Sequence, residues 1–455
     1  MKTLAQIYDI FLSCEGISTD TRKITANSMF FALKGENFNG NKFATEALTK
    51  GAKYVIIDEI ADEIRVHENT EKYILVNNVL EILQQLATFH RKQFKIPFIA
   101  IVGSNGKTTT KELIKAVLSK KYRTYATAGN FNNHIGVPIT LLNMPKDTEI
   151  AVIEMGANQL GDNAELCRFA APTHGVATNV GHDHLEGFGT IENVFRSQTE
   201  LYEFLLKNDG IVVANSADFM LSNAVKRRFK PENIRWYGSE NDFLHLKLVT
   251  VNPYILYEDD EKQIVQTQLI GAYNLPNIMV ALAFGKLFNV PLHLAHDAVV
   301  SYSPTNNRSQ LIEKNGYSII SDAYNANPSS MQAALENLAA IESSHKTAII
   351  GDMFEMGEES VLRHNEILTI AANLLRNTSI QQFLVCGKDF YKAHKNKELT
   401  DYQQNKENID IENSLIVFET KLELQAWLAT NKLPKGYVLL KASRGIGLET
   451  VLETL

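Results

Sequence analysis

The chain has only three cysteines in 455 residues, Cys14, Cys167 and Cys386, and they lie far apart. An odd number at these spacings fits neither a disulfide framework nor a zinc site and suits a reducing compartment. No apolar run approaches the ~20 residues that a helix needs to cross a bilayer. The first eleven residues lack the basic start and long apolar run of a signal peptide. We therefore expect a soluble, cytoplasmic protein without membrane insertion.

Positive charge is also scarce, since 45 Lys and Arg stand against 52 Asp and Glu, which gives a net charge of −7. This balance argues against a dedicated nucleic-acid-binding protein. Internal repeats and low-complexity segments are lacking. Hydrophobic residues make up 45% and charged residues 21%, as in ordinary globular proteins. The length predicts about three domains, and a monomer is the default expectation.

Short apolar runs alternate with helical patterns along most of the chain. Strands that are apolar on both faces, separated by helices, indicate mostly parallel sheets covered on two sides. We therefore predict an α/β protein of three domains: residues 1–95, 96–308 and 309–455. A β-rich stretch at about 245–270 interrupts the second domain. The expected strands are at 28–33, 53–57, 73–76, 98–102, 150–153, 175–180, 317–320, 347–350, 383–386 and 437–440.

The strongest motif is Gly103-Ser-Asn-Gly-Lys-Thr-Thr-Thr110, between the strand at 98–102 and an amphipathic helix. The standard phosphate loop has a glycine where this chain has Ile101. The loop nevertheless offers backbone N–H groups and a helix N-terminus to an anion. Lys107 would reach the β- and γ-phosphates, and Thr108 would ligate Mg²⁺. A plain glycine-rich connection is the alternative, and the strand–loop–helix context favours phosphate binding.

Polar side chains follow other expected strands. Residues 127–138 form a polar loop for which a structural turn is the default interpretation. Glu154 ends a buried strand, where α/β folds bind ligands, so it is a candidate Mg²⁺ ligand. Capping of a neighbouring helix is an equal alternative for this carboxylate. His182, Asp183 and His184 share one strand-end loop, which favours a metal or phosphate site over a structural role.

Together these motifs resemble the Mur ligases of peptidoglycan synthesis, whose relatives include the folylpolyglutamate synthases. The resemblance covers essentially the whole chain in the same order, at residues 103–109, 129–138, 154–158, 184–189, 322–328, 351–357 and 441–445. It implies a small N-terminal α/β domain for a uridine nucleotide, a central ATPase domain with a phosphate loop, and a C-terminal Rossmann-like domain.

The resemblance also implies roles for individual residues. Lys107 and Asn133 would contact the ATP phosphates, Thr108 a first Mg²⁺, and Glu154 and His184 a second Mg²⁺. The implied ATP-binding set is Gly103, Ser104, Asn105, Gly106, Lys107, Thr108, Thr109, Asn277, Arg308, Asp322 and Asn325. Asn277 would face the adenine, although Tyr273 stands where the family often has histidine. Tyr324 and Asn327 would line the part of the site that holds ATP and the amine substrate.

In the N-terminal domain, Ser18-Thr-Asp-Thr-Arg22 resembles the uridine-nucleotide motif of the family. The implied substrate-binding residues there are Ser18, Asp20, Thr21, Arg22, Asn39 and Gly40. An exposed salt bridge in a turn is the alternative for Asp20 and Arg22, and without the resemblance it would be preferred.

The motifs are most similar to those of the family member that adds D-alanyl-D-alanine to UDP-N-acetylmuramoyl-tripeptide. The resemblance therefore implies three small-molecule substrates, these two and ATP, and an acyl-phosphate intermediate. Closure of the C-terminal domain would accompany turnover. The alternatives are a sibling ligase with another amine acceptor and a nucleotide-binding homologue without turnover. The uridine motif argues against the folate enzymes.

Gln198 is a departure from the family, in which most members have a lysine at the aligned position that CO₂ carbamylates to support the second Mg²⁺. Helical spacing places Gln198 in line with Val194 and Leu201, so it should face inward. A buried amide needs partners. A core hydrogen bond is one interpretation, and a neutral metal ligand or water anchor beside Glu154 and His184 is the one that we favour. Activity should then be independent of added bicarbonate.

Overall fold

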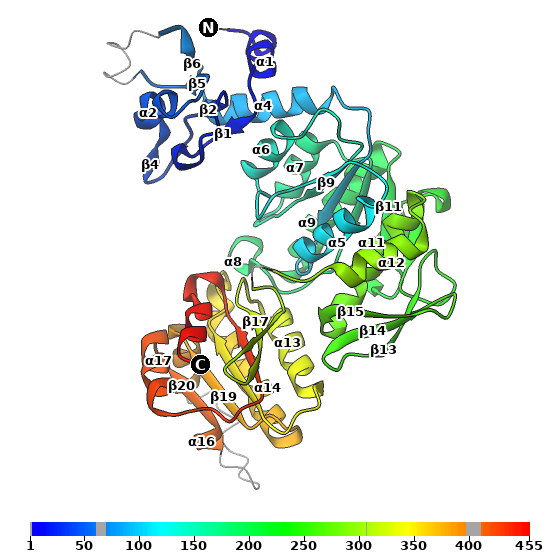
Figure 1. Cartoon of the computed structure of the whole chain (residues 1–455), viewed down its shortest axis with the longest axis vertical. Helices are drawn as coiled ribbons and strands as arrows, with labels where there is room; N and C mark the ends of the chain where they lie inside the picture. Colours follow the sequence, from blue (N-terminus) through cyan, green and yellow to red (C-terminus); the bar gives the residue numbers. More distant parts are fainter. Residues whose placement is uncertain (1, 61–69, 306, 397–410) are drawn as a thin grey trace.

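The computed structural model describes residues 2–60, 70–305, 307–396 and 411–455. Three α/β units follow one another along the long axis of the molecule, from the blue N-terminal unit to the orange and red C-terminal unit (Figure 1). Each unit is built around its own mainly parallel sheet, as the alternating apolar runs predict. The three-domain α/β architecture is therefore confirmed.

The N-terminal sheet has the order β1-β2-β5-β6, and all of its strands are parallel. The polar segment at 35–41, expected as a simple connection, contains a short antiparallel pair, because the same turn residues also suit a hairpin. The strands are β1 (Ile17–Ser18), β2 (Met29–Phe31), β3 (Lys34–Gly35), β4 (Phe38–Asn39), β5 (Tyr54–Ile57) and β6 (Tyr73–Leu75). The helices are α1 (Leu4–Leu12), η1 (Thr21–Lys23), η2 (Gly40–Phe43), α2 (Ala44–Thr49), η3 (Thr70–Lys72) and α4 (Val79–Arg91).

The central sheet has six parallel strands in the order β12-β11-β10-β7-β9-β8. Its strands are β7 (Phe98–Val102), β8 (Thr124–Ala126), β9 (Ile150–Glu154), β10 (His174–Ala177), β11 (Ile211–Asn215) and β12 (Ile234–Tyr237). The helices around it are α5 (Lys107–Leu118), α6 (Gly136–Leu142), α7 (Asp162–Ala170), α8 (Leu185–Phe188), α9 (Ile191–Lys207), α10 (Phe219–Lys226), η4 (Pro231–Asn233), η5 (Ala272–Asn274), α11 (Leu275–Leu287) and α12 (Leu292–Ser301). An antiparallel sheet adds β13 (Leu246–Thr250), β14 (Tyr254–Asp259) and β15 (Ile264–Ile270), which confirms the β-rich stretch.

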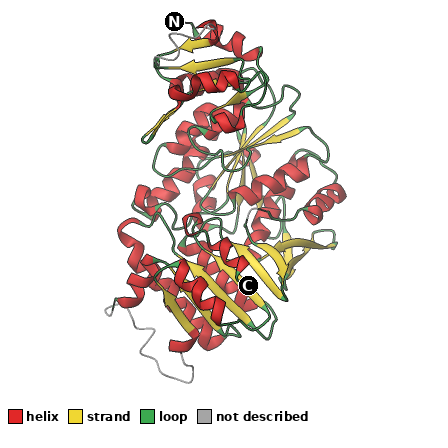
Figure 2. Ribbon diagram, turned by 60° about the vertical axis from the view of Figure 1, so that its left-hand side comes forward, coloured by secondary structure: helices red, strands yellow, loops and turns green. Residues whose placement is uncertain are grey.

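Strand β7 shows why these strands are apolar throughout. Phe98, Ala100 and Val102 pack into a core shared with α6, α7 and α9, whereas Ile99 and Ile101 pack on the other face, with α5 and α11. Alternate side chains of a strand point to opposite faces, so helices on both sides require apolar residues at every position. Figure 2 shows helices on both sides of the strands of the central unit.

The C-terminal sheet has the order β16-β17-β21-β18-β19-β20, with only β16 antiparallel. Its strands are β16 (Gln310–Lys314), β17 (Tyr317–Asp322), β18 (Lys346–Gly351), β19 (Gln382–Cys386), β20 (Leu415–Phe418) and β21 (Tyr437–Lys441). The helices are α13 (Pro328–Ala340), η6 (Gly357–Glu359), α14 (Ser360–Asn377), α15 (Lys388–Lys395), α16 (Ile411–Ser414), α17 (Lys421–Thr430), η8 (Arg444–Ile446) and η9 (Leu448–Glu453).

All of the expected strands exist, and eight more were not predicted: β1, β3, β4, β8, β11, β12, β16 and β20. The three large sheets lie within the three predicted residue ranges, while the boundaries themselves stay a prediction. All three cysteines are free. Among the described helices, none is both long and apolar enough to span a membrane.

Candidate nucleotide-binding site

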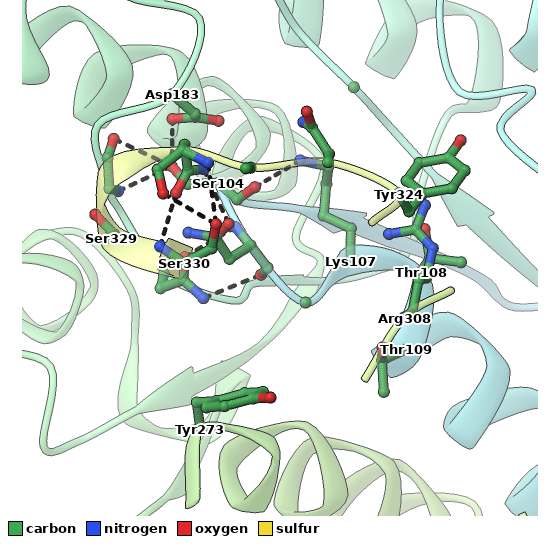
Figure 3. A pocket seen from close by; sticks show the side chains of 18 of the residues that line it. Ser104, Lys107, Thr108, Thr109, Asp183, Tyr273, Arg308, Tyr324, Ser329 and Ser330 are labelled. Atoms are coloured by element: carbon green, nitrogen blue, oxygen red, sulfur yellow. Dashed lines mark hydrogen bonds between the residues drawn. The ribbon is translucent and has the colours of Figure 1, made fainter. Parts of the chain in front are cut away.

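A cavity of about 520 Å³ lies where loops of the central domain meet the C-terminal domain. Its lining residues come from loops that follow β7, β8, β9 and β10, from the start of α11, and from residues that follow β17 (Figure 3). Fifteen of the residues to which the resemblance gives a role line it: Ser104, Asn105, Gly106, Lys107, Thr108, Thr109, Asn133, Glu154, His184, Asn277, Arg308, Asp322, Tyr324, Asn325 and Asn327. Asp183 and Tyr273, also named from the sequence, line it as well. The carboxyl ends of parallel strands are the usual ligand-binding edge of such sheets.

Two glycines of the phosphate-loop motif have backbone conformations that other residues rarely adopt. Gly103 has φ +132°, and a Cβ there would lie 2.0 Å from Thr178 Oγ1. Gly106 has φ +80° and immediately precedes α5. Both positions therefore need glycine. The Lys107 ammonium donates to the backbone oxygens of Gly103 and Ser104, so its charge lies over the loop that would hold the phosphates.

Glu154 is a buried and tightly held carboxylate of the cavity. It ends β9 with 2% of its side chain exposed. Its Oε1 accepts hydrogen bonds from Thr108 Oγ1 at 3.0 Å and Asn132 Nδ2 at 2.9 Å. Its Oε2 has no hydrogen-bond partner and lies 3.4 Å from the ammonium of Lys111, which is fully buried. The carboxylate is thus fixed next to the phosphate loop and does not cap a neighbouring helix.

His184 connects the two sides of the cavity. It precedes α8 in the left-handed conformation, with φ +48°, which is uncommon for a non-glycine residue and costs energy. Its Nδ1 lies 2.6 Å from Glu355 Oε2 of the C-terminal domain, and this contact lowers the pKa of Glu355. The backbone of Glu355 also accepts a hydrogen bond from Glu186 N. The strained histidine is therefore held by the opposite domain.

On the C-terminal side, Asp322 is shared between two donors. Its Oδ1 accepts from Ser309 N at 3.0 Å, and its Oδ2 from the buried ammonium of Lys441 at 2.6 Å. Arg308 stacks on the ring of Tyr324, with Cζ 3.6 Å from the ring centroid. Asp322, Arg308 and Tyr324 line the same cavity as the phosphate loop.

A direct hydrogen bond joins the phosphate loop to the C-terminal domain. Asn327 caps α13 by accepting Ser330 N on its Oδ1 at 2.8 Å. Its Nδ2 donates to Asn105 Oδ1 of the loop at 2.9 Å. Tyr273, at the position where the family often has histidine, bonds Ser309 through its hydroxyl at 2.9 Å.

Two amides of the cavity are already engaged in local bonds. Asn277 bonds Asn274 at 2.8 Å and accepts from Thr110 Oγ1 at 3.1 Å. Asn133 accepts the backbone N–H groups of residues 135 and 136 and so closes the turn before α6. The motif at 127–138 is thus a structural turn that also brings polar side chains to the cavity.

The N-terminal candidates lie outside this cavity. Asp20 and Arg22 form an exposed ion pair at 2.8 Å, and the arginine lowers the pKa of Asp20 to about 2. Asn39 accepts from Asn41 N and bonds Glu59, and Gly40 is buried. Ser18 and Thr21 flank Asp20, to whose backbone Ser18 bonds. The turn salt bridge considered from the sequence is present, and a role in nucleotide binding stays a prediction.

Gln198 is buried on α9, as helical spacing predicts, with 3% of the residue exposed. It is not among the residues that line the cavity. Its Oε1 accepts from Asn163 Nδ2 of α7 at 3.4 Å. The structure thus places Gln198 in a hydrogen bond of the core, which was the alternative considered less favoured. Among the described residues, no group of three His, Cys, Asp or Glu side chains forms a ready metal cluster.

Sequence reasoning missed Asn132, Lys111 and Lys441. Asn132 lies in the polar loop at 127–138, and Lys441 begins a motif that carries the resemblance, so both had a signal. Lys111 had none, because a lysine in a helix is normally solvated.

Comparisons with known proteins agree along the whole chain. Residues 13–91 match the Mur ligase family catalytic domain, residues 101–285 the Mur ligase middle domain, and residues 307–444 the Mur ligase glutamate ligase domain. The chain is 33% identical to the UDP-N-acetylmuramoyl-tripeptide–D-alanyl-D-alanine ligase of Bacillus subtilis, over 97% of this chain and 93% of the relative. The Escherichia coli enzyme of the same name is 28% identical over 100% and 98% of the two chains.

Solved structures are similar over the same extent. MurF from Acinetobacter baumannii has a TM-score of 0.82 at 26% identity and covers 99% of this chain and 98% of its own. MurF from Thermotoga maritima, solved in complex with ADP, has a TM-score of 0.78 at 28% identity and covers 100% and 98%. With the phosphate loop, the strand-end carboxylate and the interdomain cavity in place, the chain belongs to the Mur ligase family.

Proposed function

We propose that the protein is an ATP-dependent ligase that joins D-alanyl-D-alanine to UDP-N-acetylmuramoyl-tripeptide in the cytoplasmic synthesis of peptidoglycan precursors. The observation that carries this proposal is the phosphate loop with Lys107 and Thr108 next to the fixed carboxylate of Glu154. The near full-length similarity to relatives of this activity supports the choice of substrates.

The chemistry requires activation, because a carboxylate does not condense with an amine at a useful rate. The terminal carboxylate of the tripeptide attacks the γ-phosphorus of ATP, the bond to ADP breaks, and an acyl phosphate forms. The amine of D-alanyl-D-alanine then attacks the acyl carbon, phosphate leaves, and the nitrogen loses a proton. Lys107 and the backbone N–H groups of the phosphate loop stabilise the charge on the transferred phosphoryl group.

Oxygen ligands suited to Mg²⁺ are present beside the loop. Glu154 Oε2 is buried without a hydrogen-bond partner, and Thr108 Oγ1 lies 3.0 Å from the other oxygen of the same carboxylate. Hydroxyl and carboxylate oxygens are the donors that Mg²⁺ prefers. Thr108 would hold one ion, and Glu154 with His184 a second. When bound, Mg²⁺ would neutralise negative charge on the phosphate oxygens.

The N-terminal domain would bind the uridine nucleotide through Ser18, Asp20, Thr21, Arg22, Asn39 and Gly40. The central and C-terminal domains would bind ATP and the dipeptide. Since the cavity is formed by two domains, movement of the C-terminal domain on nucleotide binding would be part of turnover.

A coupled phosphate-release assay tests the proposal. Release should require ATP, UDP-N-acetylmuramoyl-tripeptide and D-alanyl-D-alanine together. The control reactions replace the dipeptide by D-glutamate or meso-diaminopimelate, or omit the tripeptide. Release that is equally fast with one of these amines would refute the choice of acceptor and favour a sibling ligase. The absence of any amine-dependent release would favour a homologue without turnover.

A further inference from the structure

Three loops meet at the carboxyl edge of the C-terminal sheet, next to the cavity. They follow β17, β18 and β21, which are adjacent in the sheet. Ser443 joins them, because its Oγ accepts from Phe354 N at 2.9 Å and donates to Ala326 O at 3.3 Å. These loops carry Tyr324, Phe354 and Arg444; the Tyr324 ring lies near the Arg444 guanidinium, and the Phe354 ring packs against Gly445, the residue that follows Arg444.

The Arg444 guanidinium is exposed at this edge. Its Cζ lies 5.3 Å from the centroid of the Tyr324 ring, whose residue lines the cavity. Within the described ranges, the Arg444 side chain makes no hydrogen bond and no ion pair with another residue. Phe354, 41% exposed, packs so closely on Gly445 that a Cβ there would lie 2.5 Å from its ring. Neighbouring loops of this edge thus carry an exposed arginine and an exposed aromatic ring.

The other cations around the cavity are placed differently. Lys107 lies over the phosphate loop, and Lys441 is buried and bonded to Asp322. Arg308 stacks directly on Tyr324 at 3.6 Å and lines the cavity itself, together with Tyr273 and Asn277. Arg444 lies farther from the same ring and does not line the cavity. It is therefore an exposed cation beside the cavity, outside the set of residues that line it.

The amine acceptor has the chemistry that this edge matches. D-alanyl-D-alanine reacts through its amine, so its carboxylate keeps its charge throughout the reaction and needs a partner in the site. A planar guanidinium binds a carboxylate through two parallel hydrogen bonds, and the exposed ring of Phe354 offers apolar surface to the methyl groups of the dipeptide. We propose that Arg444 binds the C-terminal carboxylate of the dipeptide acceptor and so selects dipeptides with a free carboxylate. This assignment rests on the proposed ligase function.

The test compares D-alanyl-D-alanine with its C-terminal amide, which keeps the reacting amine and removes only the carboxylate charge. The parent enzyme should have a kcat/KM for the acid about 10- to 100-fold above that for the amide, the range expected for hydrogen bonds to a charged group. Arg444→Ala should lower kcat/KM for the acid by about the same factor. It should leave kcat/KM for the amide and the KM for ATP almost unchanged, so that the preference for the acid over the amide disappears. Arg444→Lys should keep part of this preference.

The matched control is Arg308→Ala, which removes the other guanidinium next to Tyr324. This variant should raise the KM for ATP and keep the preference for the acid. Three results would overturn the assignment while the ligase function stands. The preference for the acid could persist in Arg444→Ala, kcat/KM could fall equally for acid and amide in that variant, or the preference could disappear in Arg308→Ala instead. A parent enzyme that releases no phosphate with the dipeptide would overturn the ligase function and this assignment with it. Since Arg444 is exposed, an unchanged unfolding temperature of the variant verifies its fold.

Discussion

The buried pair of Lys111 and Glu154 allows a sharp test of how the site is held together. The perturbation is Lys111→Met, which keeps an unbranched chain of similar length and removes the charge. The Lys111 ammonium is fully buried and lies 3.4 Å from Glu154 Oε2, which has no hydrogen-bond partner. The variant therefore leaves a carboxylate with 2% exposure facing an apolar side chain.

The magnitude follows from that burial. Removal of one partner of a buried ion pair costs about 3–5 kcal/mol. The two hydrogen bonds to Glu154 Oε1 remain, so we expect a loss of unfolding free energy at the lower end, about 3 kcal/mol. The second acid near the ammonium, Glu112 at 3.1 Å, is 39% exposed and contributes little. Replacement of both partners, Lys111→Met with Glu154→Gln, should cost much less than the sum of the single changes, because no unpaired charge is left.

Urea unfolding measured by tryptophan fluorescence suits this protein, which has two tryptophans. Trp236 lies on β12 of the central sheet and Trp427 on α17 of the C-terminal domain. With Trp427→Phe in every background, the signal reports the domain that contains the pair. A change below about 1 kcal/mol in Lys111→Met, or additive losses in the double variant, would refute the electrostatic reasoning.

Three further predictions concern the other domains and the reaction. Lys107→Ala should lower turnover in the phosphate-release assay by on the order of 100-fold or more, because the positive charge that faces the transferred group is lost. The circular dichroism spectrum should be unchanged, and near-normal turnover would contradict the assignment. Asp20→Ala or Arg22→Ala should raise the KM for the uridine substrate and leave the KM for ATP unchanged. The unfolding temperature should also stay the same, since the ion pair is exposed. Equal effects on the KM of both substrates would argue against a role in uridine binding. Burial lowers the pKa of His90 from 6.5 to about 4, so the unfolded chain binds more protons between these values and stability should fall as the pH drops from 6.5 to 4. His90→Phe should reduce that slope in urea titrations at pH 7 and 4.5, and an unchanged slope would count against this cause.

The sequence predicted the parts of the site that depend on local pattern. The strand at 98–102 is apolar at every position and is followed by a glycine-rich loop, so the strand–loop–helix order of β7 and α5 was predicted correctly. The inward face of Gln198 followed from helical spacing in the same way. Strand β8 has only three residues, too few for a periodic signal.

The contacts between segments could not be predicted. Lys111, on the helix that follows β7, meets Glu154, at the end of β9, because β7 and β9 are neighbours in the sheet. The order of strands in a sheet cannot be predicted from the sequence of either strand by itself. Gln198 bonds Asn163 because α7 packs on α9, which also depends on the assembled fold. The antiparallel edge strand β16 was missed for a related reason, since its partly exposed residues do not form the continuous apolar run of a buried strand.

The two bonds of Asn327 make its position intolerant of substitution in a way that burial alone does not. One end of the amide accepts a backbone N–H and starts α13, and the other end donates to Asn105 of the phosphate loop. Aspartate retains the acceptor but has no donor, and serine is too short to serve both partners. Asparagine is the smallest side chain that meets both demands. A single residue therefore both starts α13 and fixes the C-terminal domain against the phosphate loop of the central domain.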